Sequence, residues 1–563
     1  MAREKIGTIS PKLLLAGPAS VTLFLVTQGV TDPVNATKFF LLGGVALALF
    51  FSIADTKTLN YLWKTYRNLL IALSIFFFAS VNSLIQSNAP LTQSLYGVYG
   101  RNNGFFLYVF LTLTSLAVLT ITTPQAFKLV IYSLVISGVV NVIYCLWVVI
   151  FGDFIGWNNP YGNILGTFGN PNFIGAFLGM FSSVLITGLI YFRKSLKITF
   201  PIILVLFITL FEIFKSNAIQ GRVLFIAGCG INFLFYLWFY RKKTWILVTS
   251  FILFILSGLF GILGALQIGP LKTFVYKDSV SLRGEYWFAG IQMGVHNLFS
   301  GVGFDAYGDW YRFFRRPSAL IRPGIDTVSN TAHNVYIDIF AFGGAPLLLS
   351  YLMINVFVAI SIFKVIRRRE KFDFSFVAIT GAWLCYQLQS VISINQVGLA
   401  LWGWVLGAAL IAYERSSQFF NNTESRNLRK QVSREIITPN LRAGIGFVIG
   451  LMIAVPPISA DMKWRSAQLS RDAVRVELSL KSGYMNPNNS VKYLNTVGLF
   501  HESGLDSLAH KYALEATKFN RNNFESWRSI TYIRNSNTSE KELAFYNMHR
   551  LDPLNPNINS GTK

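Results

Sequence analysis

Long apolar stretches alternate with short polar connections along most of the chain. A helix needs about 20 apolar residues to cross a bilayer, and most of these stretches are roughly 16 to 30 residues long. Their length and continuous apolar character predict membrane-spanning helices rather than strands. Thirteen such spans are predicted, at residues 13–30, 38–53, 69–84, 105–121, 129–151, 173–192, 200–214, 223–240, 245–268, 334–363, 374–392, 397–412 and 445–458.

The composition agrees with this pattern. Of the 563 residues, 53% are hydrophobic and only 13% are charged, which is typical of a chain that is polar only at its ends and loops. The sequence therefore predicts an all-α, polytopic bundle of membrane helices. Membrane helices occupy residues 1–268 and 333–460, a long loop occupies residues 269–332, and a polar helical tail occupies residues 461–563.

The net charge of +23 is distributed in a way that predicts topology rather than binding to nucleic acid. Lysine and arginine concentrate in alternate connections, which the positive-inside rule assigns to the cytoplasm. With a cytoplasmic N-terminus and thirteen spans, the long loop and the tail are expected outside the cytoplasmic membrane. The basic residues behind this assignment are Arg3, Lys5, Lys57, Lys64, Arg67, Arg193, Lys194, Lys197, Arg241, Lys242, Lys243, Arg367, Arg368, Arg369, Lys371, Arg426, Arg429, Lys430 and Arg434.

The sequence predicts neither a disulfide nor a metal site. Cys145, Cys229 and Cys385 all lie within apolar stretches, so the exported parts hold no disulfide. The sequence has no metal-ligand spacing, no Asp-x-Asp pair and no glycine-rich loop of the kind that binds ATP. The first apolar stretch is expected to be retained, because no small-residue cleavage site precedes Asp32.

The tail has the pattern of paired helices. Small residues such as Ala509, Ala513 and Ala516 recur along it, and Asn-Pro pairs at 486–487 and 555–556 mark turns. This pattern is similar to degenerate tetratricopeptide repeats, in which small residues let two helices approach closely. Such repeats offer concave surfaces, so a protein partner on the tail is expected. The alternative is an unrelated helical tail.

Several arginines lie on the predicted outer side, where basic residues are otherwise sparse. Arg101 and Arg222 each stand at the edge of a span, and Arg283 lies in the long loop. The planar donors of a guanidinium match two phosphate oxygens, so these residues are candidates for phosphate binding. The alternative is that they reach toward lipid headgroups. The loop also holds a further basic cluster of Arg312, Arg315, Arg316 and Arg322.

His333 lies where the long loop ends and the next span begins. It is predicted to occupy the first turn of that helix, with Ser329, Asn330 and Thr331 as candidate caps. The positive end of the helix dipole favours the neutral imidazole, which can accept a proton, and it attracts anions. His333 is thus the candidate general base, and an interfacial packing residue is the alternative. Activity is expected to fall as the pH drops from about 8 to 5.

Several motifs together resemble the bacterial O-antigen ligase and O-antigen polymerase superfamily of polytopic glycosyltransferases. They are residues 166–176, Gly221 with Arg222, Arg283 with Trp287, residues 301–303, the Ala-His-Asn-Val-Tyr segment at 332–336, and Gly343 with Gly344. Two positions depart from the family pattern. Asn297 stands where the family often has proline, and Phe342 stands where it commonly has glutamate.

The departure at Phe342 leaves the acidic partner of His333 open. Asp338 is expected on another face of the helix, because it is five residues further along. Glu285 and Asp326 are candidate partners from the loop.

The resemblance implies transfer of a whole glycan from a polyprenyl-diphosphate carrier to a hydroxyl acceptor, at the outer face of the bacterial cytoplasmic membrane. His333 would take the acceptor proton, while Arg222 and Arg283 would hold the diphosphate. The reaction would invert the anomeric carbon and need no metal or cofactor. Arg101, the four arginines of the loop cluster, Asn334 and Tyr336 are assigned to substrate binding. The apolar bundle, within the membrane lipids, would hold the isoprenoid tail.

Three functions remain open, two of them enzymatic. A ligase would transfer the glycan to lipid A core or to a protein Ser or Thr, and a polymerase would extend the lipid-linked glycan itself. The third is a flippase or transporter of glycolipids, which usually has charged residues in mid-span and internal helix repeats. The spans at 13–30 and 374–392 carry no charge and no inverted repeat is visible, so transport is disfavoured.

Overall fold

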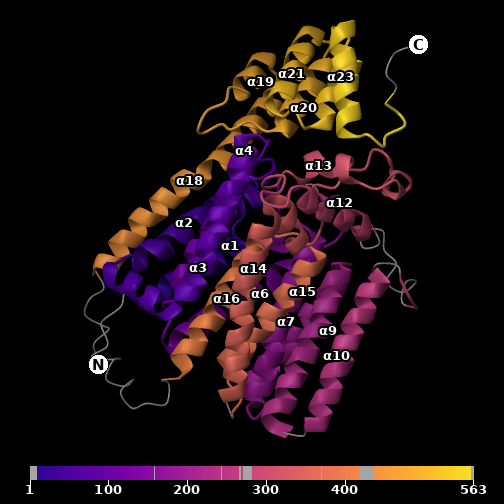
Figure 1. The fold of residues 1–563 in the computed structure, drawn as a ribbon. Helices are drawn as coiled ribbons and strands as arrows, with labels where there is room; N and C mark the ends of the chain where they lie inside the picture. Colours follow the sequence, from indigo (N-terminus) through magenta and orange to yellow (C-terminus); the bar gives the residue numbers. More distant parts are fainter. Residues whose placement is uncertain are drawn as a thin grey trace.

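The computed structural model describes residues 9–157, 159–241, 244–265, 268–270, 282–368, 371–418 and 437–558. These described residues form helices and no strand, which confirms the all-α prediction (Figure 1). The helices are α1 (Pro11–Leu23), α2 (Asn35–Ile53), α3 (Thr56–Gln86), α4 (Leu91–Tyr96), α5 (Phe105–Val118), α6 (Pro124–Phe151), α7 (Pro171–Phe192), α8 (Leu196–Lys215), α9 (Ile219–Tyr236), α10 (Thr244–Ala265), α12 (Arg283–His296), α13 (Tyr307–Phe314), α14 (Val335–Arg368), α15 (Phe374–Ile392), α16 (Val397–Ser417), α18 (Ile437–Ser470), α19 (Ala473–Ser479), α20 (Ser490–Glu502), α21 (Asp506–Phe519), α22 (Phe524–Tyr532) and α23 (Thr538–Leu551). The basic residues Arg3, Lys5, Lys242, Lys243, Arg369, Arg426, Arg429, Lys430 and Arg434 lie outside the described residues, and the topology drawn from them stays a prediction.

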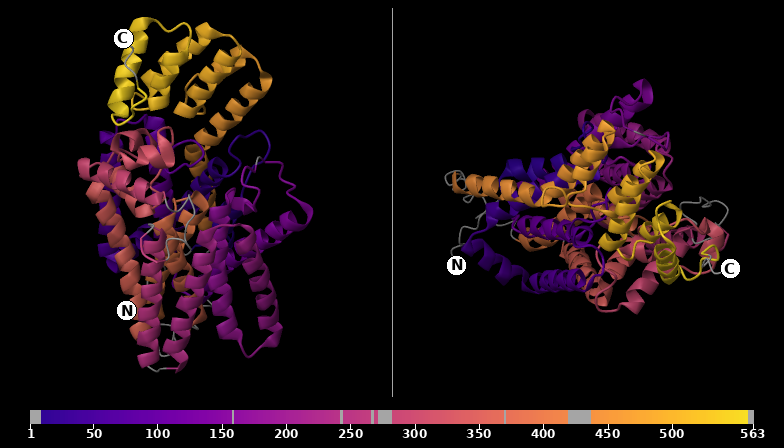
Figure 2. Two further views of the ribbon diagram at one scale, coloured as in Figure 1. Left: turned by 90° about the vertical axis from the view of Figure 1, so that its right-hand side faces the viewer. Right: turned by 90° about the horizontal axis from the view of Figure 1, so that it is seen from above.

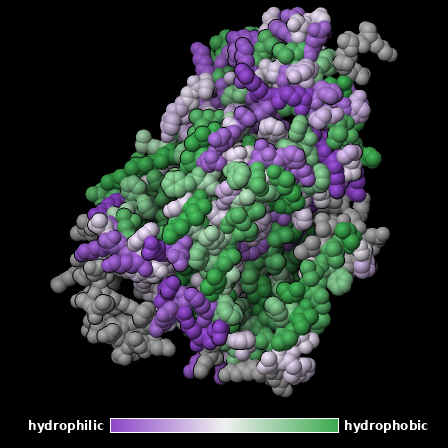
Figure 3. All heavy atoms as spheres, viewed as in Figure 1, coloured by the Kyte–Doolittle hydropathy of each residue, from purple (hydrophilic) through white to green (hydrophobic). Residues whose placement is uncertain are grey.

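Eleven of the described helices are long and apolar enough to cross a membrane. Helix α16 is enclosed by the others, whereas the apolar side chains of α10 point outward. Hydrophobic side chains gather on the surface around the long helices, and hydrophilic ones gather over the C-terminal helices and at the opposite end (Figure 3). The chain is therefore a multi-pass membrane protein.

Two of the thirteen predicted spans are shorter than expected. The stretches at 13–30 and 105–121 form helices α1 and α5, with 13 and 14 residues against the roughly 20 needed to cross. Helix α1 ends early where the ammonium of Lys38 bonds the carbonyl oxygens of Val21 (3.3 Å), Thr22 and Phe24 (3.0 Å). A buried cation is stabilised there because the C-terminal end of a helix carries partial negative charge.

Helix α18 packs tightly along α2. A Cβ atom on Gly450 would lie 2.0 Å from the carbonyl oxygen of Gly43, so only glycine lets the two backbones come this close. Close approach through small residues is the usual way that membrane helices associate. Helix α18 then continues to Ser470 and leads into the C-terminal helices, so the boundary predicted at residue 460 falls within a continuous helix (Figure 1).

Helices α19 to α23 form a small helical domain at one end of the bundle (Figure 2). Its core includes Val497, Phe500, Ala513, Trp527 and Ile530. Helix α20 packs against α21, and α22 packs against α23. The paired helices and buried alanines agree with the sequence pattern, whereas membership in the tetratricopeptide family stays a prediction.

Helix α14 is interrupted in its first half. Gly344 has a φ of 66°, a left-handed conformation that favours glycine, and its neighbour Ala345 donates its N–H to the carbonyl oxygen of Leu298 at 2.7 Å. The N–H groups of Val302 and Gly303 donate in turn to the carbonyl oxygens of residues 341 and 342, at 2.8 and 3.1 Å. The two glycine motifs noted in the sequence thus meet, and their contact fixes the loop against α14.

Candidate active site

His333 sits in a strained turn just before α14. Its φ is 54°, which costs a residue other than glycine about 1–3 kcal/mol, and such conformations cluster at functional sites. Asp338 holds the turn, because its carboxylate accepts hydrogen bonds from the Thr331 hydroxyl (2.6 Å) and the Ala332 N–H (2.7 Å). The predictions of a first-turn histidine and of caps at residues 329–331 were therefore wrong. Asn334 caps the helix, since its side-chain oxygen accepts from the N–H groups of residues 336 and 337.

The surroundings of His333 keep its imidazole neutral. Burial lowers the pKa of this side chain to about 3, and the positive charges of Arg101 and Arg283 add to the effect. The aromatic ring of Tyr286 lies against the imidazole, with 5.8 Å between the ring centroids. His333 is thus in the form that accepts a proton throughout the physiological pH range.

Arg101 and Arg283 approach His333 from different elements. Arg101 lies in the loop between α4 and α5, and Arg283 is the first residue of α12. Burial lowers the pKa of both, to about 10 for Arg283, while the carboxylates of Asp305 and Asp338 oppose this effect at Arg101. Among the described residues, Arg101 Nη1 and Arg283 Nε are buried and find no hydrogen-bond partner. Buried cationic donors that are left open in this way are suited to an anion.

Arg222 belongs to a different helix from these residues. It occupies the first turn of α9, where its guanidinium stacks over the ring of Phe214, with 5.2 Å to the ring centroid. The charges that act on the pKa of His333 are those of Arg101 and Arg283, and Arg222 is not among them. Its buried Nε also has no partner among the described residues.

Two of the loop arginines bind the C-terminal domain. Arg315 donates to both carboxylate oxygens of Asp552, at 2.8 and 2.7 Å, and both side chains are fully buried. Arg312 donates to Asp552 at 3.2 Å and to Glu525 at 2.9 Å. This placement argues against the phosphate-binding role expected from the sequence, because protein carboxylates already occupy these guanidiniums.

The other two loop arginines lie near the surface. Arg316 forms a two-point ion pair with Glu285, with its Nε and Nη2 at 2.7 and 2.9 Å from the carboxylate oxygens. Arg322 is exposed in the segment that follows α13. The remaining acidic candidate, Asp326, is exposed and lies 3.4 Å from Arg528. Glu285 and Asp326 thus pair with arginines, and the structure assigns neither as the partner of His333.

Loss of Asp552 is expected to loosen the C-terminal domain. The substitution Asp552→Ala leaves two buried guanidiniums without their main partner, which should destabilise the docked domain by about 3–5 kcal/mol. Limited proteolysis and thermal unfolding of the purified protein would measure this. The control Asp326→Ala removes an exposed ion pair and should cost less than about 1 kcal/mol. Equal stability of the two variants would contradict a docking role for the buried pairs.

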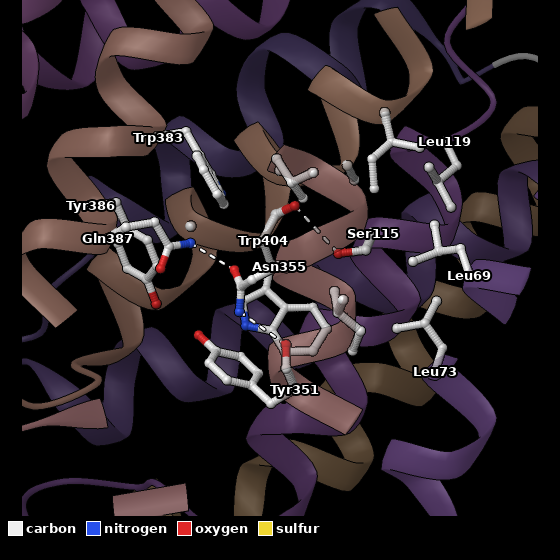
Figure 4. Close-up of a pocket in the computed structure, with 16 residues that line it drawn as sticks. Leu69, Leu73, Ser115, Leu119, Tyr351, Asn355, Trp383, Tyr386, Gln387 and Trp404 are labelled. Atoms are coloured by element: carbon white, nitrogen blue, oxygen red, sulfur yellow. Dashed lines mark hydrogen bonds between the residues drawn. The ribbon is translucent and has the colours of Figure 1, made fainter. Parts of the chain in front are cut away.

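Tyr336 faces the interior of the bundle. Its hydroxyl donates to the side-chain oxygen of Gln387 at 2.5 Å, and the amide of Gln387 donates to Asn355 at 2.8 Å. Gln387 and Asn355 border a cavity of about 30 Å³ between the long helices (Figure 4). Small-molecule sites usually measure about 300–1,000 Å³, so this cavity is too small for the expected isoprenoid tail. With these bonds the structure supports a packing role for Tyr336, as it supports a capping role for Asn334.

Sequence reasoning missed the acidic and aromatic surroundings of His333. Asp338 was expected on another helix face, but the turn at His333 precedes the helix, so helical spacing does not apply there. In the sequence, Asp305 is notable only because it follows a glycine motif, and Tyr286 only because it follows Arg283. Neither position indicates a place near His333. No group of three His, Cys, Asp or Glu side chains arranged to hold a metal occurs in the part of the chain that the structure describes.

The fold and the site together define a polytopic helical membrane protein with a neutral histidine and open arginine donors at one end of its bundle. The sequence model of the O-antigen ligase family matches residues 217–352, from the start of α9 to the middle of α14. Over this segment the chain is similar to the O-antigen ligase family. The matched segment includes Arg222, Arg283 and His333. No curated protein matches the chain.

Proposed function

We propose that this protein is a glycosyltransferase of the O-antigen ligase type. It moves a glycan from a polyprenyl-diphosphate carrier to a hydroxyl acceptor at the outer face of the bacterial cytoplasmic membrane. The observation that carries the proposal is the neutral imidazole of His333 beside two buried guanidiniums whose donors are open. A base next to an anion site is what this transfer requires.

The proposed reaction proceeds in one displacement. His333 takes the proton of the acceptor hydroxyl as its oxygen attacks the anomeric carbon of the donor glycan. The bond from that carbon to the phosphate oxygen breaks, and the carrier diphosphate leaves with the electron pair. Arg283 and Arg101 hold the leaving diphosphate, whose negative charge grows during the step. Attack from the face opposite the leaving group inverts the anomeric centre.

Two further features complete the proposal. Arg222 contacts the donor at a second point, away from His333, which its own open Nε supports. Asp338 acts as a positioning residue, because it holds the turn that carries His333. The acceptor decides between a ligase, which uses lipid A core or a protein hydroxyl, and a polymerase, which uses another lipid-linked glycan.

Mass spectrometry of candidate acceptors would test the proposal. The purified protein is incubated with a polyprenyl-diphosphate glycan, each acceptor in turn, and a metal chelator. A mass gain equal to the glycan on one acceptor is the expected result and identifies the acceptor class. No gain on any acceptor, with protein shown to be folded, would overturn the transferase function in favour of glycolipid transport.

The expectation from the sequence, that activity falls as the pH drops from about 8 to 5, is replaced by a different pH dependence. Because burial and two arginines lower the pKa of His333 to about 3, the free protein keeps the base form above that pH. The value of kcat/KM, which reports the free enzyme, should therefore show no acid limb from His333 between about pH 5 and 8. A bound diphosphate offsets the arginine charges, so the acid limb of kcat should lie at higher pH than that of kcat/KM. Profiles of both constants against pH would check this, and an acid limb of kcat/KM near 6.5 would contradict it.

A further inference from the structure

A cavity of about 430 Å³ lies between the bundle and the C-terminal domain. Four segments and Ala36 of α2 line it, and the segments are residues 92–102, residues 305–330, the end of α18, and residues 487–525 of the C-terminal domain. Its size falls within the range of about 300–1,000 Å³ that is usual for small-molecule sites. The docked domain forms part of its wall, since Arg312 and Glu525, which form one of the docking ion pairs, both line the cavity.

The charge of the lining excludes a diphosphate. Acidic residues outnumber basic ones in the wall, with Asp305, Asp309, Asp326, Asp461 and Glu525 against Arg312 and Lys492, and the Lys492 ammonium already donates to Asn486 at 2.9 Å. The nearby guanidinium of Arg312 is already paired with Glu525 and Asp552. A like charge placed beside several carboxylates is repelled, so an anionic ligand belongs with the arginines around His333 and not here.

Two buried polar atoms in the lining have no partner. The side-chain oxygens of Asn102 and Asn488 accept no hydrogen bond from the described residues, although both side chains are only 3% exposed. Each of these side chains already uses its amide group as a donor, Asn102 toward Tyr96 and Asn488 toward Leu480 and Tyr493. Leaving a buried acceptor unpaired costs about 1–3 kcal/mol, so a ligand that supplies donors favours a turn of either amide toward the cavity.

The lining also offers aromatic surface. Tyr96, Tyr99, Trp464 and Phe524 border the cavity from three different segments. Aromatic rings pack against the C–H faces of sugars, while carboxylate and amide groups bond to hydroxyls. A ligand that combines apolar faces with many hydroxyl donors satisfies both parts of this lining, and an uncharged sugar has that character.

The cavity adjoins the candidate active site. Asn102 follows Arg101 in the chain, and Asp305, which lines the cavity, interacts electrostatically with Arg101. A glycan that extends from the reacting carbon or from the acceptor hydroxyl can therefore enter the cavity while its reacting end stays near His333.

We propose that this cavity binds an uncharged, hydroxyl-rich saccharide segment of a substrate, with the side-chain oxygens of Asn102 and Asn488 accepting its hydroxyl hydrogens. The proposal rests on the proposed glycosyltransferase function, because the saccharide is taken to be part of the donor or the acceptor. The docked C-terminal domain then helps to select which glycan is handled.

Retention on an array of neutral and anionic oligosaccharides would test this proposal with the full-length protein in detergent. Val491 lines the cavity from the second position of α20, and it is 38% exposed, so Val491→Trp fills the cavity without disturbing a core. Val474→Trp is the matched control, because Val474 is the second residue of α19, is 61% exposed and lies outside the lining. Wild type and control should retain neutral glycans, and Val491→Trp should lose about tenfold or more in affinity.

The outcomes separate this inference from the proposed function. Retention needs no turnover, so His333→Ala should bind the array as the wild type does. If retention depends on Val491 but no transfer is ever detected, the saccharide site stands and the transferase function fails. Preference for anionic glycans, no retention of any neutral glycan, or equal retention by both tryptophan variants would overturn the saccharide site. In the transfer assay, a rise in KM for the donor alone or for the acceptor alone with Val491→Trp identifies the substrate that enters the cavity.

Discussion

Replacing His333 is expected to lower kcat by about 10²–10⁴, because general-base help to an acceptor hydroxyl has that magnitude. Burial, aided by the charges of Arg101 and Arg283, keeps the imidazole neutral, so it is in the form that accepts a proton. Donor binding should persist, since the open donors of Arg101 and Arg283 remain in place. The loss should therefore appear in kcat much more than in the KM for the donor.

The choice of replacement matters because His333 has a φ of 54°. His333→Asn is the most informative variant, since asparagine adopts the left-handed region readily but cannot act as a base. His296→Ala is the matched control: His296 is exposed at the end of α12, and its ring bonds the carbonyl oxygen of Gln292 in its own helix. Glycan transfer measured by mass spectrometry should fall for His333→Asn and stay at the wild-type level for His296→Ala. Full activity of His333→Asn would show that His333 is not the general base.

The sequence predicted the helices well because length and hydropathy alone decide which segments enter a membrane. All of the predicted spans coincide with helices, including the two short ones at α1 and α5. The early end of α1 could not be predicted, because it depends on Lys38 reaching back from α2 to the last carbonyl groups. That contact exists only once two helices have packed.

The contacts of the arginines could not be predicted from the sequence. Arg101 and Arg222 look alike in the sequence, since each stands at the edge of a span, yet only Arg101 contributes to the electrostatics of His333. The loop cluster appeared unbalanced because its carboxylate partner lies far along the chain. Arg315 and Asp552 are separated by 237 positions, and no local pattern predicts such a pair.

The C-terminal domain contacts the loop arginines and also lines the 430 Å³ cavity. The buried ion pairs of Arg312 and Arg315 fix the domain over α13, and Asp309 accepts hydrogen bonds from Gln93 in the bundle and from Asn520 in the domain, both at 3.0 Å. These contacts create the wall of the 430 Å³ cavity. Loss of docking should therefore affect glycan selection even though His333 and its arginines lie outside the domain.

Replacing Arg283 with alanine is expected to lower kcat by about 10²–10³, which corresponds to about 3–4 kcal/mol for one well-placed stabiliser of a developing charge. Arg283 is 8% exposed, and its Nε finds no partner among the described residues, so its loss removes an anion contact rather than an internal ion pair. Arg283→Lys should recover only part of the activity, because an ammonium keeps the charge but lacks the planar pair of donors. Arg316→Ala, which removes an exposed ion pair with Glu285, is the matched control and should stay near the wild-type rate.

The pH profile distinguishes an electrostatic role of Arg283 from a structural one. The positive charge of Arg283 helps to lower the pKa of His333, so removing it should move that pKa upward toward its ordinary value. The acid limb of kcat/KM should consequently shift to higher pH in Arg283→Ala and stay in place in Arg283→Lys, which retains the charge. A variant that merely folded poorly would lose rate equally at every pH. Lower rates with an unchanged profile in both variants would therefore count against the placement of Arg283 beside the base.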